Sequence, residues 1–281
     1  MIDIHNHVLH GLDDGAETLE ESVEMCRISF DDGVRTIVAT PHTLNSVYEN
    51  KRSTILAKVQ ELNAVIDGEF LYTPSPFLQS GVSSATRRPT GTGTKLDNPT
   101  NQVNLKIVPG ADVHFSEEVL SPQYRDEIMT VADGGKFLLL EFPSQGIPFE
   151  TETILFELMV RGVIPIITHP ERNLEIAHSS KRYSHMVERG CLGQISAASL
   201  TGGFGRNARQ AAEKLLRKNL VHFIASDAHS LNGRPPGLSS AVRAAAKIVG
   251  EAEARKMVTE YPQAIIEGRR PNVPEPKESL R

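Results

Sequence analysis

The first residues of the chain, Ile2-Asp3-Ile4-His5-Asn6-His7, followed by Leu12-Asp13-Asp14-Gly15, set two histidines inside a short apolar run typical of a β-strand. Residues i and i+2 of a strand point to the same face, so His5 and His7 should project together. Asp13 and Asp14 follow in a loop past the end of that strand. Imidazoles beside a carboxylate are ligands that divalent metal ions prefer. Asp14 is the expected ligand, whereas Asp13 is expected to cap the loop.

Apolar strands and amphipathic helices alternate along the rest of the chain. A helix begins at Thr18, which forms a capping box with Glu21, and ends at Gly33. The expected strands cover residues 2–8, 34–40, 105–108, 137–141, 163–168, 191–196 and 221–226, and the further helices 49–66, 117–131, 150–161, 178–189, 205–218, 237–248 and 251–259. The strands are continuous apolar runs, as expected when helices cover both faces of a parallel sheet. This pattern predicts an α/β fold, a (β/α) barrel, with a doubly wound open sheet as the alternative.

Residues 72–102 interrupt the alternation. Ser, Thr, Gly, Pro and Asn dominate this stretch, and a structureless segment of such length is unusual inside a compact domain. We interpret it as a surface insertion or a lid rather than a domain boundary. One domain is therefore expected over residues 1–270, followed by a Pro-rich, charged tail at 271–281 that frays.

The composition excludes several classes of function. A net charge of −5 offers no basic surface for nucleic acid. No apolar run reaches the roughly 18–20 residues of a membrane-spanning helix, and the first residues lack the pattern of a signal peptide. Two cysteines, Cys26 and Cys191, are too few for a disulfide framework. We therefore expect a protein of the reducing cytoplasm, without membrane insertion.

Further histidines and carboxylates stand where the predicted strands end. The candidates are His42, Asp112, Glu141, His169, Asp227 and His229. In a parallel α/β fold the carboxyl ends of the strands meet on one face, which is the usual place of catalysis. Any one of these residues could instead be a hydrogen-bonded structural group. All of them are expected on the same face as His5 and His7. This favours a metal centre, because so many carboxylates in one place would repel one another without cations.

The ligand types indicate which ions to expect. Nitrogen and oxygen ligands without a thiolate suit Mn²⁺, Fe²⁺, Co²⁺ or Zn²⁺ in a reactive site better than a structural zinc site. The number of ligands exceeds what one ion needs, so we expect two or three ions.

Two arginines, Arg172 and Arg234, follow His169 and His229 closely in the sequence. A guanidinium beside several metal ions suits the charge and geometry of a phosphoryl group. This combination predicts hydrolysis of phosphomonoesters, with a metal-bridging hydroxide as the nucleophile. A cysteine-dependent phosphatase is excluded because the residues six positions after the two cysteines are Asp32 and Ala197 rather than arginine.

Taken together, these motifs resemble the polymerase and histidinol phosphatase (PHP) superfamily, and within it the bacterial metal-dependent protein-tyrosine phosphatases of the CpsB/CapC/YwqE type. The resemblance rests on Met1–His7 with Leu12–Gly15, Ala39-Thr-Pro-His42, Gly110-Ala-Asp112-Val, Leu140-Glu141-Phe, Thr168-His169-Pro-Glu-Arg172, Gln194–Gly205, and Ser226-Asp227-Ala-His229 with Gly233-Arg234-Pro-Pro. These motifs occur in order from residue 1 to about residue 270.

The resemblance implies a distorted TIM-like (β/α)7 barrel with a trinuclear centre, usually of Mn²⁺ or Fe. It implies one ion held by His5, His7, Glu141 and Asp227, a second by His42, Asp112, Glu141 and His169, and a third by Asp14 and His229. Arg172 and Arg234 would bind the phosphate. The implied substrate is the phosphorylated tyrosine-rich tail of a kinase of exopolysaccharide or capsule synthesis, and the implied role is the regulation of exopolysaccharide.

Two features depart from the family pattern. Asp112 stands where the family usually has Glu, so its ion is expected to sit differently or bind more weakly, and the insertion at 72–102 is longer than usual. Three alternatives stay open: a small-molecule phosphatase of the histidinol-phosphatase type, a non-catalytic metal-binding PHP module and, more distantly, a metal-dependent amidohydrolase. The sequence leaves the oligomeric state open.

Overall fold

Parallel β-strands form the centre of the molecule in the computed structural model, which describes residues 1–69, 105–121 and 127–277. The strands are β1 (Ile2–Asn6), β2 (Thr36–Ala39), β3 (His42–Thr43), β4 (Lys106–Pro109), β5 (Asp112–His114), β6 (Phe137–Glu141), β7 (Ile164–Thr168), β8 (Leu192–Ser196) and β9 (Phe223–Ala225). They form one sheet in the order β1-β2-β4 and a second in the order β3-β5-β6-β7-β8-β9.

Two strand positions of the barrel are interrupted. β2 continues as β3 and β4 continues as β5, and each continuation lies in the other sheet. Pro41 separates β2 from β3 and has no N–H to donate to a neighbouring strand. Gly110 separates β4 from β5, and a Cβ atom there would lie 2.6 Å from Cγ1 of Val38. Only glycine fits at this place. These breaks distort the barrel, in which seven strand positions remain when each interrupted strand is counted once.

The two sheets meet where β1 passes β9. Asn6 forms a parallel bridge with Ala228, and the backbone N–H of Asp227 donates to the carbonyl of His5 at 2.8 Å. The N–H of His7 donates to the carbonyl of Ala228 at 2.9 Å. These contacts join the first strand to the last, so the sheet is closed and the open doubly wound alternative is wrong.

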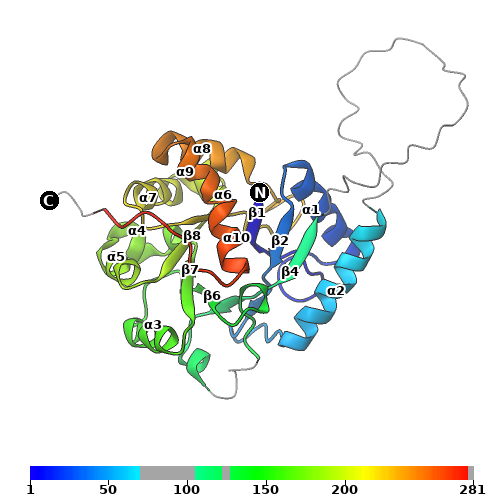
Figure 1. Cartoon of the computed structure of the whole chain (residues 1–281), viewed down its shortest axis with the longest axis horizontal. Helices are drawn as coiled ribbons and strands as arrows, with labels where there is room; N and C mark the ends of the chain where they lie inside the picture. Colours follow the sequence, from blue (N-terminus) through cyan, green and yellow to red (C-terminus); the bar gives the residue numbers. More distant parts are fainter. Residues whose placement is uncertain (70–104, 122–126, 278–281) are drawn as a thin grey trace, which may run out of the picture.

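Helices lie around the strands on most sides (Figure 1). The α-helices are α1 (Leu19–Asp31), α2 (Arg52–Glu69), α3 (Thr151–Val160), α4 (Leu174–His178), α5 (Lys181–Glu188), α6 (Ala197–Thr201), α7 (Gly205–Arg217), α8 (Ser239–Val249), α9 (Glu251–Lys256) and α10 (Glu260–Ile266). Thr18 caps α1, because its side chain accepts the backbone N–H of Glu21 at 3.2 Å. The core between helices and strands is mainly aliphatic, and Ile4, Ile37 and Leu139 are fully buried.

Some predicted elements differ from the structure. The helix predicted over 117–131 is wrong at both described ends, where short 3₁₀ turns η2 (Glu117–Leu120) and η3 (Val131–Asp133) occur instead. The helix predicted over 178–189 corresponds to α5, and the short helices α4, α6 and α10 were not predicted. The tail does not fray at Glu275 and Lys277, whose backbone groups hydrogen-bond to Asn219 and Lys218 at 2.8 and 2.9 Å. The insertion at 72–102 lies outside the described residues, and the single domain over 1–270 stays a prediction.

Candidate metal centre

His5 on β1 and His7, which directly follows this strand, have their Nε2 atoms 3.1 Å apart. Each ring is held from behind at Nδ1: Gln194 Oε1 lies 2.9 Å from His5 and Asp13 Oδ2 lies 2.6 Å from His7. Amide and carboxylate oxygens only accept hydrogen bonds, so Nδ1 of each ring must carry the proton. In the neutral imidazole this proton leaves Nε2 of each ring with the lone pair that a metal-binding histidine uses.

Two buried aspartates from distant strand ends face these rings. Asp112 on β5 has Oδ2 3.6 Å from His5 Nε2, and Asp227 after β9 has Oδ1 3.5 Å from the same nitrogen. One ligand atom each from His5, His7 and Asp112 lies within 4.8 Å of the others. A single cation could be shared by this group.

A second group gathers at the more exposed side of the site. Asp14 is half exposed, and its Oδ1 lies 3.5 Å from Nε2 of His42 and 3.5 Å from Nε2 of His229. The His7 and His229 ring centroids are 3.7 Å apart. His7, Asp14, His42 and His229 thus form a set whose ligand atoms lie within 4.8 Å of one another.

The third group includes Glu141 at the end of β6. Nδ1 of His42 lies 3.4 Å from Asp112 Oδ2 and 3.7 Å from Glu141 Oε2. His169 Nε2 approaches the other oxygen of Glu141 at 3.5 Å. Glu141 therefore lies with His42, Asp112 and His169, and the three groups do not place it with His5 and His7. How the ligands divide among the ions stays a prediction.

Unusual backbone conformations turn two of these side chains into the site. His169 follows β7 with φ 32° and Asp227 follows β9 with φ 54°, the left-handed region that is costly for residues with a Cβ atom. Such strain persists where surrounding contacts over-determine it, and it gathers at functional sites. At His169 the turn starts the short helix η4 (Pro170–Arg172), which brings Arg172 back over the site.

Several buried atoms of the site lack a hydrogen-bond partner among the described residues. These atoms are Nδ1 of His42, Oδ2 of Asp112 and Nε2 of His229. A buried polar atom without a partner costs roughly 1–3 kcal/mol, and cations bound to these groups would satisfy the three atoms. The donor set, imidazole nitrogens with carboxylate oxygens, is the one that divalent transition metals prefer. The residues present therefore fit a metal centre.

The site also shifts the protonation of its own groups. Burial alone would lower the pKa of His42, but contact with Asp112 and Glu141 outweighs burial and raises it to about 9. Burial and the nearby His7 lower the pKa of His229 to about 2. For Asp227, burial is outweighed by His5, His169 and the two arginines, so its pKa falls well below the usual range. The carboxylate of Asp227 is thus ionised, as cation binding requires.

Arg172 and Arg234 both reach the same carboxylate. Nη1 of Arg172 lies 2.8 Å from Asp227 Oδ2, and Nη2 of Arg234 lies 2.6 Å from Oδ1. The loop after β9 holds Arg234 in place, because its carbonyl accepts the backbone N–H of His229 at 2.9 Å. Two guanidinium groups therefore stand beside the clustered ligands, where an anionic group would meet both.

A family model described as "Capsular polysaccharide synthesis, CpsB/CapC" matches residues 1–72 and 84–267. The chain belongs to this family. The matched ranges contain every candidate ligand and both arginines. The family membership predicted from the motifs is thus confirmed.

Among the relatives of this CpsB/CapC chain is the tyrosine-protein phosphatase YwqE of Bacillus subtilis strain 168. The two are 32% identical over 266 residues, which cover 95% of this chain and 91% of YwqE. The putative tyrosine-protein phosphatase CapC of Staphylococcus aureus is 33% identical over 235 residues, covering 84% and 79% of the two chains. The tyrosine-protein phosphatase CpsB of Streptococcus pneumoniae is 28% identical over 274 residues, covering 95% and 98%.

A solved structure agrees with the fold of this family member. It belongs to a study of YwqE from Bacillus subtilis and CpsB from Streptococcus pneumoniae, described as unique metal-dependent tyrosine phosphatases. The superposition covers 100% of both chains with a TM-score of 0.83 and 31% sequence identity. The distorted barrel of the PHP type is confirmed.

The sequence analysis missed four side chains that support the CpsB/CapC site. Gln194 orients His5, Asp13 orients His7, and Ser196 donates to Asp227 Oδ2 at 3.1 Å. His114, which is not among the candidate ligands, lies with Nδ1 3.8 Å from Oε2 of Glu141. A signal existed for Gln194 and Ser196: they are polar residues two apart in an otherwise apolar strand, which places them on one face.

Both cysteines lie away from this chemistry. Cys26 and Cys191 are buried, and burial raises the pKa of each thiol, for Cys191 to about 12. Neither thiol is available as a thiolate near neutral pH. In addition, none of the described helices is both long and apolar enough to cross a membrane.

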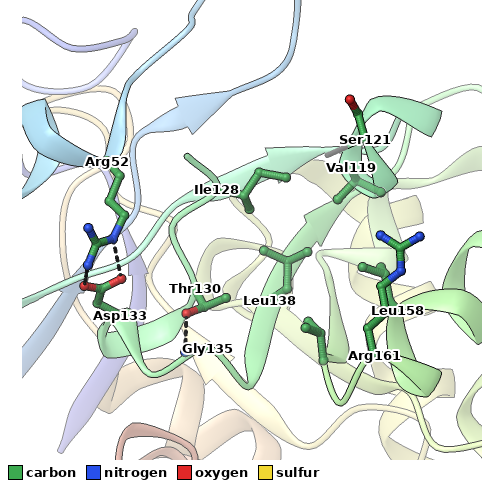
Figure 2. A pocket seen from close by; sticks show the side chains of 11 residues that line it. Arg52, Val119, Ser121, Ile128, Thr130, Asp133, Gly135, Leu138, Leu158 and Arg161 are labelled. Atoms are coloured by element: carbon green, nitrogen blue, oxygen red, sulfur yellow. Dashed lines mark hydrogen bonds and ion pairs between the residues drawn. The ribbon is translucent and has the colours of Figure 1, made fainter. Parts of the chain in front are cut away.

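A separate cavity of about 590 Å³ lies toward the N-terminal ends of β6 and β7 (Figure 2). Thr130 and Val163, which precede these strands, help to line it, and no candidate ligand does. Its arginines have protein partners: Arg52 donates to Asp133 at 2.9 Å and Arg161 to the carbonyl of Leu120 at 2.8 Å. We assign no ligand to this cavity.

Proposed function

We propose that this chain is a metal-dependent tyrosine-protein phosphatase of capsular polysaccharide synthesis that uses the site at the carboxyl ends of its barrel strands. The observation that carries the proposal is the pair Arg172 and Arg234, both directed at Asp227 beside three groups of potential metal ligands. Two arginines that can bind an anion lie next to side chains that can bind metal ions. Hydrolysis of a phosphoryl group uses both the arginines and the metal ions. The family of the chain and the names of its relatives support the same activity.

We assign the metal ligands to His5, His7, Asp14, His42, Asp112, Glu141, His169, Asp227 and His229. Two or three ions fit this number of ligands, because one ion rarely takes more than six. Mn²⁺ or Fe is the expected identity, and Zn²⁺ and Co²⁺ suit the same ligands. Divalent ions in such a site supply positive charge for the phosphoryl oxygens and lower the pKa of bound water.

The side chains around the ions have separable tasks in this proposal. Arg172 and Arg234 bind the phosphoryl oxygens and stabilise the charge that grows on them during transfer. Asp13 and Gln194 hold His7 and His5 with Nε2 forward. Asp14 is half exposed and so marks the side of the site from which a substrate can enter. The buried cysteines take no part.

The substrate we propose is the phosphorylated tyrosine-rich tail of a kinase of exopolysaccharide or capsule synthesis. A tail is an extended, mobile segment, and it can bring a phosphotyrosine to a site that lies at the end of a barrel rather than in a deep cleft. The relatives' link to capsular polysaccharide synthesis supports this assignment.

A comparison of substrates on metal-loaded protein tests the function. Phosphate release from a phosphotyrosine tail peptide should exceed release from histidinol phosphate and other small phosphomonoesters in kcat/KM. A preference for the small substrates would overturn the substrate assignment and favour a small-molecule phosphatase. Elemental analysis of protein purified without chelator should give two or three ions per chain, and fewer than two would contradict a multinuclear centre.

Variants separate catalysis from simple metal binding. His5→Ala should lose both metal and activity, whereas Arg234→Ala should keep the metal and lose activity by roughly 10²–10³-fold, as expected for a transition-state donor. Exposed residues provide matched controls: His185→Ala on α5 and Arg217→Ala on α7 should leave both properties unchanged. If the loaded wild type releases no phosphate, the chain is a binding module.

A further inference from the structure

The ring of Phe204 lies against both candidate phosphate arginines. The guanidinium carbon of Arg172 lies 4.5 Å from the ring centroid, and that of Arg234 lies 5.7 Å from it. Distances up to about 6 Å allow attraction between a cation and the negative face of an aromatic ring. Phe204 is half-buried in the connection between α6 and α7, so it belongs to the same end of the barrel as the ligands.

The local sequence Gly202-Gly203-Phe204-Gly205 is suited to presenting this one side chain. Gly202 and Gly205 have φ values of +92° and +83°, which side chains with a Cβ atom rarely adopt. The N–H of Gly203 donates to the carbonyl of Ala198 at 2.7 Å, and a Cβ at 203 would lie 3.2 Å from that of Ala198. Three glycines in four residues are entropically costly. This entropic cost has a structural reason if the turn must hold the ring of Phe204 against the two arginines.

The arginine pair needs support besides Asp227. Its two guanidinium groups carry like charges and share one carboxylate. Oδ1, the partner of Arg234, also faces His5 at 3.5 Å and His7 at 3.8 Å, so a cation bound there would compete with Arg234 for this oxygen. Nε of Arg234 is buried without a hydrogen-bond partner among the described residues. A contact that needs no hydrogen bond would keep Arg234 in place when the ion is bound.

We propose that Phe204 is a positioning residue that holds the guanidinium groups of Arg172 and Arg234 together for the phosphate, an inference that rests on the proposed function of these arginines. The aromatic ring contacts the guanidinium groups through its π-face and occupies none of their N–H donors. One donor of each arginine reaches Asp227, and such donors are what a phosphoryl group binds. The ring restricts both arginine side chains before phosphate binds, so less conformational entropy is lost on binding.

Two substitutions test the role of the ring. Phe204→Leu keeps an apolar side chain but removes the π-face, whereas Phe204→Tyr keeps it. Binding of inorganic phosphate to metal-loaded protein, measured by calorimetry, should weaken about threefold to thirtyfold in Phe204→Leu and stay within about twofold of wild type in Phe204→Tyr. KM for the phosphotyrosine peptide should rise in parallel, with unchanged metal content and melting temperature.

A double-mutant cycle and a control complete the test. With Arg172→Lys as the second change, the effect of Phe204→Leu should shrink, because contacting residues couple. Phe156→Leu, at a 60% exposed position on α3, should change nothing. Unchanged phosphate binding in Phe204→Leu, additive effects in the cycle, equal losses in Leu and Tyr, or loss of metal would each overturn the proposal. Phosphate binding is read without turnover, so failure of the tyrosine-phosphatase assignment is distinguished from failure of the Phe204 role.

Discussion

Asp13 Oδ2 lies 2.6 Å from Nδ1 of His7 and accepts the backbone N–H of His42 at 2.8 Å. One oxygen atom thus fixes the ring of one candidate ligand and the start of the strand that carries another. The contact with His7 outweighs the burial of Asp13 and lowers its pKa to about 2, so the carboxylate is ionised at any ordinary pH. Asp13 was expected only to cap its loop, which it also does by accepting the N–H of Gly15 at 2.9 Å.

Asp13→Asn should weaken metal binding without unfolding the protein. The amide keeps the size of the side chain but loses the charge that fixes the His7 tautomer, and changes of this kind cost roughly tenfold to a hundredfold in metal affinity. Calorimetric titration with Mn²⁺ measures the effect. Asp31→Asn, an exposed position at the end of α1, is the matched control. Equal affinities of Asp13→Asn and wild type would show that the carboxylate does not orient His7.

Metal binding should release a proton from His42. A pKa of about 9 means that its free imidazole is charged at pH 7, and a protonated nitrogen cannot bind a cation. The apparent affinity should therefore fall about tenfold for each pH unit below 9. His169 and His229, with pKa values lowered to about 4 and about 2, are already neutral and should release none.

Buffers with different ionisation enthalpies allow this proton to be counted. Titration with Mn²⁺ should release about one proton at pH 7 and about a quarter of a proton at pH 9.5. His42→Gln should abolish the difference between the two pH values. The same release at both would contradict a charged His42.

Glu171 should make the protein less stable as the pH rises. It is buried, accepts Ser199 Oγ at 2.7 Å and the N–H of Ser196 at 3.0 Å, and its pKa is raised by burial from 4.5 to about 7. The folded state then holds a proton that the unfolded state has lost, so stability is full below pH 4.5 and falls until about pH 7.

Glu171→Gln removes this titration and keeps an acceptor for both donors. Its stability relative to wild type should therefore rise between pH 4.5 and pH 8, by up to about 3 kcal/mol. Urea unfolding of metal-free protein at several pH values measures the difference. Glu188→Gln, exposed on α5, should show none. A constant difference across the pH range would exclude a protonated Glu171.

Removal of the ions should destabilise the fold. The unpartnered atoms of His42, Asp112 and His229 lose their compensation when no cation is bound. Mn²⁺ at a hundred times its Kd should raise the free energy of unfolding by about 2.7 kcal/mol for one site. Thermal melts with and without chelator provide the measurement. His5→Ala should reduce the change in melting temperature caused by chelator, and His185→Ala should not. A melting temperature that is the same with and without chelator would exclude a metal centre built from these atoms.

The residues at the strand ends could be predicted because parallel strands impose their own geometry. His42, Asp112 and Glu141 follow apolar runs, and in a parallel sheet such positions must reach one face whatever the loops do. The same logic predicted most strands within two residues of their observed ends.

Contacts that depend on how loops pack could not be predicted in this way. Gln194 reaches His5 across 189 positions, and Phe204 meets its arginines only after α6 and η4 have packed. The helix predicted over 117–131 failed because apolar spacing alone does not distinguish a helix from short turns that bury the same residues, such as Val119 and Val131. Local pattern places Gln194 on one face of its strand, but it does not identify which distant residue each of these side chains meets.

The bond between Asp3 and Ser226 spans 223 positions, and it closes the barrel beside the bridge of Asn6 to Ala228. During synthesis on a ribosome, His5 and His7 leave the exit tunnel long before Asp227 and His229 are translated. A nascent chain therefore carries two imidazoles and no enclosed site. The full set of proposed ligands exists only when translation has passed His229 and the long-range contacts have closed. Products that end before Asp227 lack two of the proposed ligands, so we expect them to bind fewer ions than the full chain.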